Sequence, residues 1–76
     1  MVKVTLPELG EGIEKATVSY WFFQEQDKVE ANADLVELVT DKATFNLPSP
    51  ATGVLSKILF REGQTVKVGD ILAEIN

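Results

Sequence analysis

The chain has 76 residues, enough for one small domain, and its twelve acidic residues outnumber seven basic ones to give a net charge of −5. It has no cysteine and no histidine, which excludes disulfides, thiol catalysis and thiolate metal sites and removes the commonest general base. The acidic balance disfavours nucleic acid and anionic membranes as partners, and a basic protein surface is the better expectation. No apolar run is long enough to span a membrane, and Met1 leads straight into a strand pattern, so we expect no signal or transit peptide.

Short runs of alternating apolar and polar residues follow one another along the whole chain, a pattern that favours strands over helices. Pro7 ends the first run, and Pro48-Ser49-Pro50 closes the fourth. Residues 25–33 tolerate a helix best, but they hold too few apolar positions for one. The spacing therefore predicts an all-β sandwich or barrel. The runs, in chain order, are residues 2–6, 18–23, 35–40, 45–47, 54–60 and 71–75.

The sequence also repeats itself. Residues 16–38 match residues 53–75 at an offset of 37, so that Leu35 falls on Leu72. Upstream, Leu6-Pro7 matches Leu47-Pro48 at an offset of 41, which predicts a loop four residues longer in the first half. The simplest interpretation is two half-domains related by a pseudo-two-fold axis.

This symmetry predicts where one turn lies. In the first half, the strand ending at Thr40 turns at residues 41–43 into the strand that begins at Thr44. In the second half, the strand ending at Ile75 is paired instead with residues 4–6. We therefore expect the turn at residues 41–43 to lie at the opposite pole from the chain termini, and the loop of residues 8–14 to lie near that turn.

Several residue types have ordinary structural interpretations. The glycines are expected at turns, and Gln26 and Asn32 stand where the second half has Gly63 and Gly69. Asparagine tolerates a left-handed backbone, so the turn at Asn32 can form. Aromatic residues within strand runs of an acidic chain indicate core packing rather than a stacking platform for bases. These aromatic residues are Trp21, Phe22, Phe23, Phe45 and Phe60.

The most informative short motif is Thr40-Asp41-Lys42-Ala43. Aspartate and lysine are acceptable in a tight turn, and aspartate can bond local backbone donors. Taken alone, the motif is an ordinary solvated turn, because such turns are common. A functional interpretation is that Lys42 presents its amine to a modifying enzyme at an exposed hairpin tip.

The surrounding sequence favours the functional interpretation. Leu6-Pro7-Glu8-Leu9-Gly10-Glu11-Gly12-Ile13, Thr40-Asp41-Lys42-Ala43, Pro48-Ser49-Pro50-Ala51-Thr52-Gly53-Val54 and the stretch Glu62-Gly63 with residues 68–75 occur in order. In this order they resemble the lipoyl domains of the acyltransferase components of 2-oxo acid dehydrogenase complexes. The resemblance covers essentially the whole chain.

The resemblance implies one lipoyl domain over residues 1–76, of the hammerhead type shared by lipoyl and biotinyl domains. Its fold would be a flattened β-barrel or sandwich of two four-stranded antiparallel sheets. Lipoate would be attached to Lys42 as N6-lipoyl-lysine, and Thr40, Asp41 and Ala43 would form the turn that the modifying enzyme recognises. The loop recognised by partner enzymes would contain Glu8, Leu9, Gly10, Glu11 and Gly12, with Glu14 adding to its acidic charge.

The function implied is that of a swinging-arm carrier, without catalysis of its own, within a parent dihydrolipoamide acyltransferase. A thiamine-dependent 2-oxo acid decarboxylase would load the arm, the acyltransferase catalytic core would receive the acyl group, and dihydrolipoyl dehydrogenase would reoxidise the arm. A lipoate ligase or lipoyl transferase would attach the cofactor. We expect the isolated domain to be monomeric, and its location to be the bacterial cytoplasm, with the mitochondrial matrix as the alternative.

Two other functions remain open at this stage. Biotinyl carriers of biotin-dependent carboxylases share the fold but typically place methionine on both sides of the modified lysine, where this chain has Asp41 and Ala43. An unmodified structural or binding module is the other alternative. One position departs from the lipoyl pattern: Val39 stands where the family usually has an acidic residue, so the identity of the modifying enzyme is open.

Overall fold

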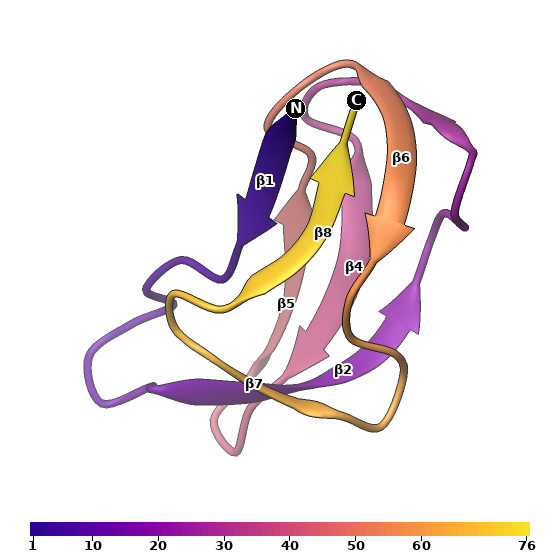
Figure 1. Ribbon diagram of the computed structural model, residues 1–76. Coiled ribbons are helices and arrows are strands. Elements are labelled where there is room, and N and C mark those ends of the chain that lie inside the picture. The colour runs from indigo at the N-terminus through magenta and orange to yellow at the C-terminus, as the bar shows by residue number, and fades with distance from the viewer.

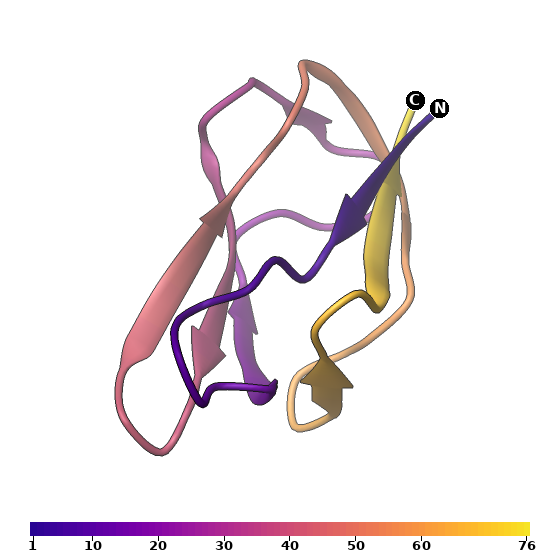
Figure 2. The same cartoon turned by 90° about the vertical axis from the view of Figure 1, so that its left-hand side faces the viewer.

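The computed structural model describes all residues 1–76 and contains eight strands and no helix. The strands form two four-stranded antiparallel sheets, with the orders β1-β8-β6-β3 and β5-β4-β2-β7. Figure 2 shows the two sheets as facing layers, which confirms the predicted all-β sandwich. The strands are β1 (Val2–Thr5), β2 (Lys15–Trp21), β3 (Lys28–Val29), β4 (Asp34–Val39), β5 (Thr44–Pro48), β6 (Gly53–Ile58), β7 (Thr65–Lys67) and β8 (Ile71–Ile75).

The two sheets are related by the predicted pseudo-two-fold symmetry. At an offset of 37, strands β2, β3 and β4 correspond to β6, β7 and β8. Strands β1 and β5 also correspond to each other, but their offset differs from the predicted value of 41. Val36 pairs with Leu47, and the equivalent Ala73 pairs with Val4, so Leu47 corresponds to Val4 at an offset of 43. The alignment of Leu6 with Leu47 was wrong, because register is set by the strand pairing and not by a two-residue identity. The offsets of 43 and 37 make the β1–β2 loop six residues longer than its counterpart, and not four as predicted.

The core lies between the sheets and consists of sixteen buried apolar residues. Strand side chains alternate between faces, and a register irregularity interrupts this alternation in β4, where Leu35 and Val36 are both buried. Among the residues with no exposed surface are Val18, Leu35, Leu38, Leu55 and Leu72. A small β domain without disulfides depends on this layer for its stability.

The aromatic residues divide between the core and the surface. Trp21 is buried, and its indole N–H donates to the carbonyl of Phe60 at 2.8 Å. Phe23 and Phe60 pack against the core. The prediction was wrong for Phe22, which is 43% exposed and meets Tyr20 edge-to-face. Phe45 is half-buried and lies outside the core cluster. Strand β2 places Trp21 on its inner face and ends there, so the next side chain points outward.

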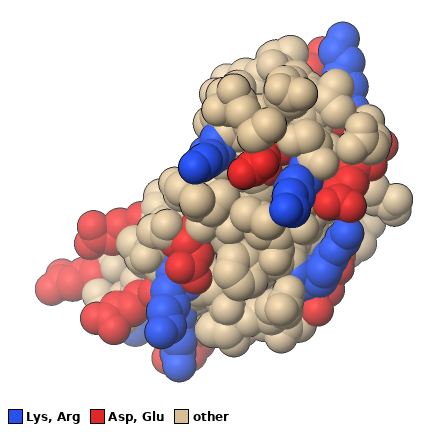
Figure 3. Space-filling model, in the orientation of Figure 1, with Lys and Arg blue, Asp and Glu red and all other residues tan.

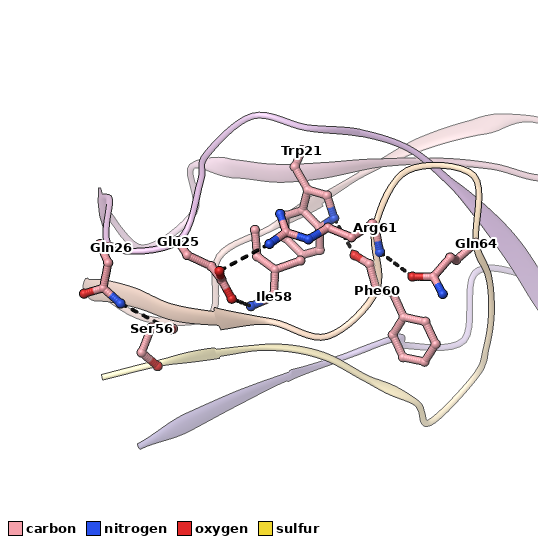
Figure 4. Close-up of polar contacts among 8 residues, drawn as sticks. All are labelled: Trp21, Glu25, Gln26, Ser56, Ile58, Phe60, Arg61 and Gln64. Atoms are coloured by element: carbon pink, nitrogen blue, oxygen red, sulfur yellow. Dashed lines mark hydrogen bonds and ion pairs between the residues drawn. The ribbon is translucent and has the colours of Figure 1, made fainter.

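A reciprocal pair of glutamates links the two halves, and Figure 4 shows one of the pair, Glu25, with its contacts to Ile58 and Arg61. Glu25 accepts the backbone N–H of Ile58 at 2.9 Å, and the equivalent Glu62 accepts that of Trp21 at 3.2 Å. The pKa of Glu62 is held below its ordinary value by its own backbone N–H, then by that of Trp21, and less by the Arg61 charge. Arg61 also forms an ion pair with Glu25 at 3.2 Å.

Two turns use a left-handed backbone in both halves. Gln26 and Asn32 have φ angles of 77° and 73°, and the equivalent Gly63 and Gly69 have 92° and 93°. The prediction that Asn32 adopts the conformation of its glycine counterpart is confirmed. Both halves therefore keep the same chain path although only one of them uses glycine.

The chain ends and the β4–β5 turn lie at opposite ends of the molecule, as predicted. Figure 1 shows the two termini together at the top and the β4–β5 turn at the bottom, and the longest dimension of the domain is 32 Å. No helix long and apolar enough to cross a membrane occurs in the chain. A group carried on the β4–β5 turn therefore projects away from both ends of the chain.

Candidate functional site: the β4–β5 turn

The turn at Lys42 is held by the side chain of Thr40. The Thr40 hydroxyl accepts the backbone N–H groups of Lys42 at 3.2 Å and Ala43 at 3.0 Å, and it donates to the carbonyl of Ala43 at 2.8 Å. The backbone N–H of Thr40 also donates to that carbonyl at 2.8 Å. Threonine hydroxyls often stabilise turns in this way. An aspartate can also bond local backbone donors in such a turn, but here the side chain that does so is Thr40.

Lys42 stands exposed at the tip of this turn. The one ion pair of the domain joins Arg61 and Glu25, so the Lys42 ammonium has no carboxylate partner within 4.0 Å. An accessible, unpaired primary amine on a short braced turn suits the formation of an amide with a carboxylic acid cofactor. The residues present therefore fit a covalently attached lipoyl group.

The β1–β2 loop lies against the same turn. A Cβ atom added at Gly12 would lie 3.4 Å from Nζ of Lys42, and Gly12 has a φ of 78°. The N–H of Ile13 donates to the carbonyl of Gly10 at 3.1 Å, which tightens the loop at this point. The predicted proximity of the loop and the lysine turn is confirmed.

The loop is acidic and mostly exposed. Glu8, Glu11 and Glu14 are exposed, whereas Leu9 is half-buried and packs against the core. In Figure 3, acidic side chains gather at the lower left, where Figure 1 places the β1–β2 loop. The structure thus brings the residues expected in recognition, 8–12, beside the residues of the turn, 40–43. The anchoring of Leu9 fixes the loop while leaving its carboxylates in water.

Sequence reasoning missed a second feature beside the turn, a hollow on the side of strands β2, β4 and β7. Its residues are far apart in sequence, and no motif joins them. The available signal was the run of β-branched residues around the turn, including Val39, which is 39% exposed.

Comparison with protein families matches residues 2–75 to the biotin/lipoyl family, described as "Biotin-requiring enzyme". The chain is 37% identical over 75 residues to the dihydrolipoyllysine-residue succinyltransferase component of the 2-oxoglutarate dehydrogenase complex of Rickettsia bellii. It is 40% identical over 76 residues to the component of that description from Bacillus subtilis, and 36% identical over 73 residues to a lipoamide acyltransferase component of the branched-chain alpha-keto acid dehydrogenase complex of Bacillus subtilis. These alignments cover 96–100% of the chain but only 17–19% of the relatives.

Among solved structures, the lipoyl domain of the 2-oxoglutarate dehydrogenase complex from Azotobacter vinelandii matches with a TM-score of 0.80 and 28% identity. The match covers 100% of this chain and 96% of that one. Urea carboxylase from Kluyveromyces lactis matches with a TM-score of 0.83 at 20% identity, over 99% of this chain and 6% of that one. The second likeness concerns the fold alone.

Proposed function

The chain belongs to the biotin/lipoyl attachment-domain family, and we propose that it is a lipoyl carrier domain with lipoate joined to Nζ of Lys42. The observation that carries the proposal is the position of Lys42, an unpaired, exposed amine on a braced turn at the pole away from the termini. The solved lipoyl domain of the 2-oxoglutarate dehydrogenase complex aligns with the whole of this chain, and this likeness supports the choice of lipoate.

The chain's own residues have a limited chemical task. Nζ of Lys42 loses a proton and bonds the carboxyl carbon of an activated lipoyl donor, whose leaving group departs. A lysine ammonium in water is protonated at neutral pH, so the modifying enzyme has to supply both the activated donor and the removal of the proton. Thr40 keeps the turn in one shape, and Asp41 and Ala43 present a small surface on either side. Once attached, the dithiolane supplies the redox and acyl-carrier chemistry that no side chain here offers.

Partner recognition is assigned to the β1–β2 loop. Residues 8–12 lie beside Lys42, and the exposed carboxylates of Glu8 and Glu11 give an encounter surface for a basic rim on a 2-oxo acid decarboxylase. The other proposed partners are the acyltransferase core, which would receive the acyl group, and dihydrolipoyl dehydrogenase, which would reoxidise the arm. The relatives are about five times longer than this chain, so we assign acyl transfer to the rest of a parent acyltransferase and only carriage to this domain.

Tethering explains why a carrier without catalytic groups is useful. A domain joined to a large complex holds its arm at a high local concentration at each active site. The termini lie at the pole opposite Lys42, so such a connection leaves the lysine turn free to enter a partner. We infer a bacterial cytoplasmic setting from the bacterial relatives.

The test is intact mass after incubation with lipoate, ATP and a lipoate ligase. We expect a gain of one lipoyl group in the wild type and in Lys57→Arg, a control that removes another exposed lysine, but not in Lys42→Arg. Peptide mapping then places the group. A lipoyl gain that survives Lys42→Arg, or no gain in a folded wild type, would refute the assignment.

A biotinyl carrier is the second candidate. The likeness to urea carboxylase concerns the fold only, and Asp41 and Ala43 stand where biotinyl domains typically have methionine. Incubation of the domain with biotin and a biotin ligase distinguishes the two. Faster modification with biotin than with lipoate would reverse the order of these candidates.

A further inference from the structure

The outer face of the β5-β4-β2-β7 sheet carries an uncharged row beside the lysine turn. Thr65 pairs with Thr17, Thr17 pairs with Val39, and Val39 pairs with Thr44, so one residue from each of the four strands lies in line. All four side chains are exposed. A quarter of this chain is charged, so a four-residue row without charge next to the modified position is a distinct surface.

A hollow of about 150 Å³ opens along this row. It is lined by Thr17, Val39 and Thr65 of the row, by Thr40 and Asp41 of the turn, and by Lys15 at the start of β2. The charged side chains at its rim, Lys15 and Asp41, have opposite signs, and only Ala16 and Val39 of the lining are hydrophobic. The hollow is therefore suited to a neutral group that lies on Val39 and whose weakly polar atoms meet the threonine hydroxyl groups.

The hollow has the right size and position for the end of the proposed arm. Its volume equals that of about five liquid water molecules, which is enough for a small five-membered ring. Thr40 and Asp41 belong both to the hollow and to the turn, so the hollow begins next to the attachment point. A lipoyl-lysine side chain extends roughly 14 Å from its Cα atom by standard bond lengths, which is enough to fold back onto Val39.

The loss of the Lys42 charge on acylation explains why the arm would move from the acidic loop to the uncharged row. The free ammonium of Lys42 lies over Gly12, in the loop that carries Glu8, Glu11 and Glu14. Acylation of Nζ removes the positive charge, and with it the attraction to the acidic loop. A neutral amide with an apolar chain then gains more from the uncharged row than from the carboxylates.

We propose, on the basis of the proposed function, that the hollow at Thr17, Val39 and Thr65 is a resting seat for the lipoyl-lysine arm, occupied once Lys42 is acylated. The seat holds the dithiolane on the sheet face and leaves the acidic loop open to a partner. The arm leaves the seat when a partner enzyme takes up the dithiolane.

The test compares amide chemical shifts of the unmodified, lipoylated and octanoylated domains, after mass and peptide mapping have established loading at Lys42. Failure of that first step concerns the proposed function and not the seat. In the lipoylated form we expect shifts at residues 17, 39 and 65 in addition to the turn, with nuclear Overhauser contacts between dithiolane protons and the Val39 methyl groups. The octanoyl chain, which lacks the ring, is expected to give smaller shifts at residue 65.

Val39→Asp places a charge in the hollow and is expected to abolish the remote shifts and the ring contacts. Thr65→Asp, across the hollow and away from the turn, is the second variant should Val39→Asp fail to load or fold. Val54→Asp, at an exposed valine on the other sheet, is the matched control and should leave the shifts as in the wild type. Shifts confined to residues 40–43, contacts to the β1–β2 loop instead, or remote shifts that persist in Thr65→Asp would overturn the proposal.

Discussion

Replacing Thr40 with valine tests whether the turn that presents Lys42 is held by a single hydroxyl. Valine keeps the shape of threonine at the end of β4 but removes the oxygen that bonds the N–H groups of Lys42 and Ala43. The backbone bond from Thr40 to the Ala43 carbonyl remains. The substitution therefore loosens the turn and leaves the β4–β5 ladder in place.

The expected magnitude follows from the number of bonds lost and from their exposure. A hydrogen bond contributes about 0.5–1.5 kcal/mol net, and water can replace the hydroxyl at this exposed site, so values at the low end apply. Loss of the three bonds of the hydroxyl, two accepted and one donated, should make opening of the turn easier by about 1.5 kcal/mol. Since 1.4 kcal/mol is a factor of ten, the amides of Lys42 and Ala43 should exchange with solvent up to about tenfold faster. The free energy of global unfolding should fall by about 1 kcal/mol, as on loss of a helix cap.

Amide exchange measured by NMR checks the local effect, and the initial rate of lipoylation, followed by intact mass, checks its consequence. We expect slower lipoylation because the modifying enzyme has to order a looser turn. Thr44→Val is the matched control, since Thr44 is exposed on β5 and its hydroxyl takes no part in the turn. If Thr40→Val leaves exchange at residues 42 and 43 unchanged, or if Thr44→Val has the same effect, the turn is not held as described.

Three further predictions concern the scaffold. The carboxylate of Glu62 has a lowered pKa in the folded state, so it stabilises the fold above the ordinary glutamate pKa, and this contribution disappears as pH falls through the lower folded value. Urea unfolding from about pH 6 to about pH 3 should show a smaller acid loss in Glu62→Gln than in the wild type, whereas Glu30→Gln should follow the wild type. Gly69→Asn should be nearly neutral in thermal unfolding because Asn32 occupies the equivalent turn, whereas Gly69→Val should cost about 1–2 kcal/mol; equal losses would contradict the symmetry argument. Gly53→Ala should lower stability by about 1–3 kcal/mol, measured by urea unfolding, because its Cβ would lie 2.5 Å from the carbonyl oxygen of Asn76; a stability equal to the wild type would show that this contact relaxes freely.

The fold could be predicted from the sequence where strands are long enough to show an apolar run. Strands β2, β4, β6 and β8 have five to seven residues and their runs were visible, although register irregularities interrupt the alternation of buried side chains. Strands β3 and β7 have only two and three residues, too few for any period, and only the resemblance implied an eighth strand. The exposure of Phe22 could not be predicted for a related reason. The sequence does not reveal the residue at which β2 ends, and that end decides which aromatic side chain points inward.

The candidate site was predictable in part. Lys42 was selected as the candidate from the order of motifs along the whole chain, because its own tetrapeptide is common in solvated turns. Its proximity to the β1–β2 loop followed from the symmetry and is confirmed by the contact with Gly12. The bonding of the turn by Thr40 was not predicted, since a threonine before a turn does not reveal the direction of its hydroxyl. The hollow depends on the registers of two strand pairs, β2–β4 and β2–β7, and those are fixed only when the sheets pack.

The symmetry of the scaffold explains why one pole carries the functional turn. The pair β4–β5 corresponds to the pair β8–β1, but Val39 and Thr44 are joined by a short turn, whereas Ile75 and Val2 belong to the two ends of the chain. The same arrangement of strands therefore produces one closed hairpin and one open pair of ends, at opposite poles. The loop that departs from the symmetry, between β1 and β2, lies beside the closed hairpin and not beside the ends. The closed hairpin and the longer β1–β2 loop, which are the two departures from the two-fold symmetry, thus meet at Lys42. Without the longer loop, a lysine on this turn would have no acidic segment beside it.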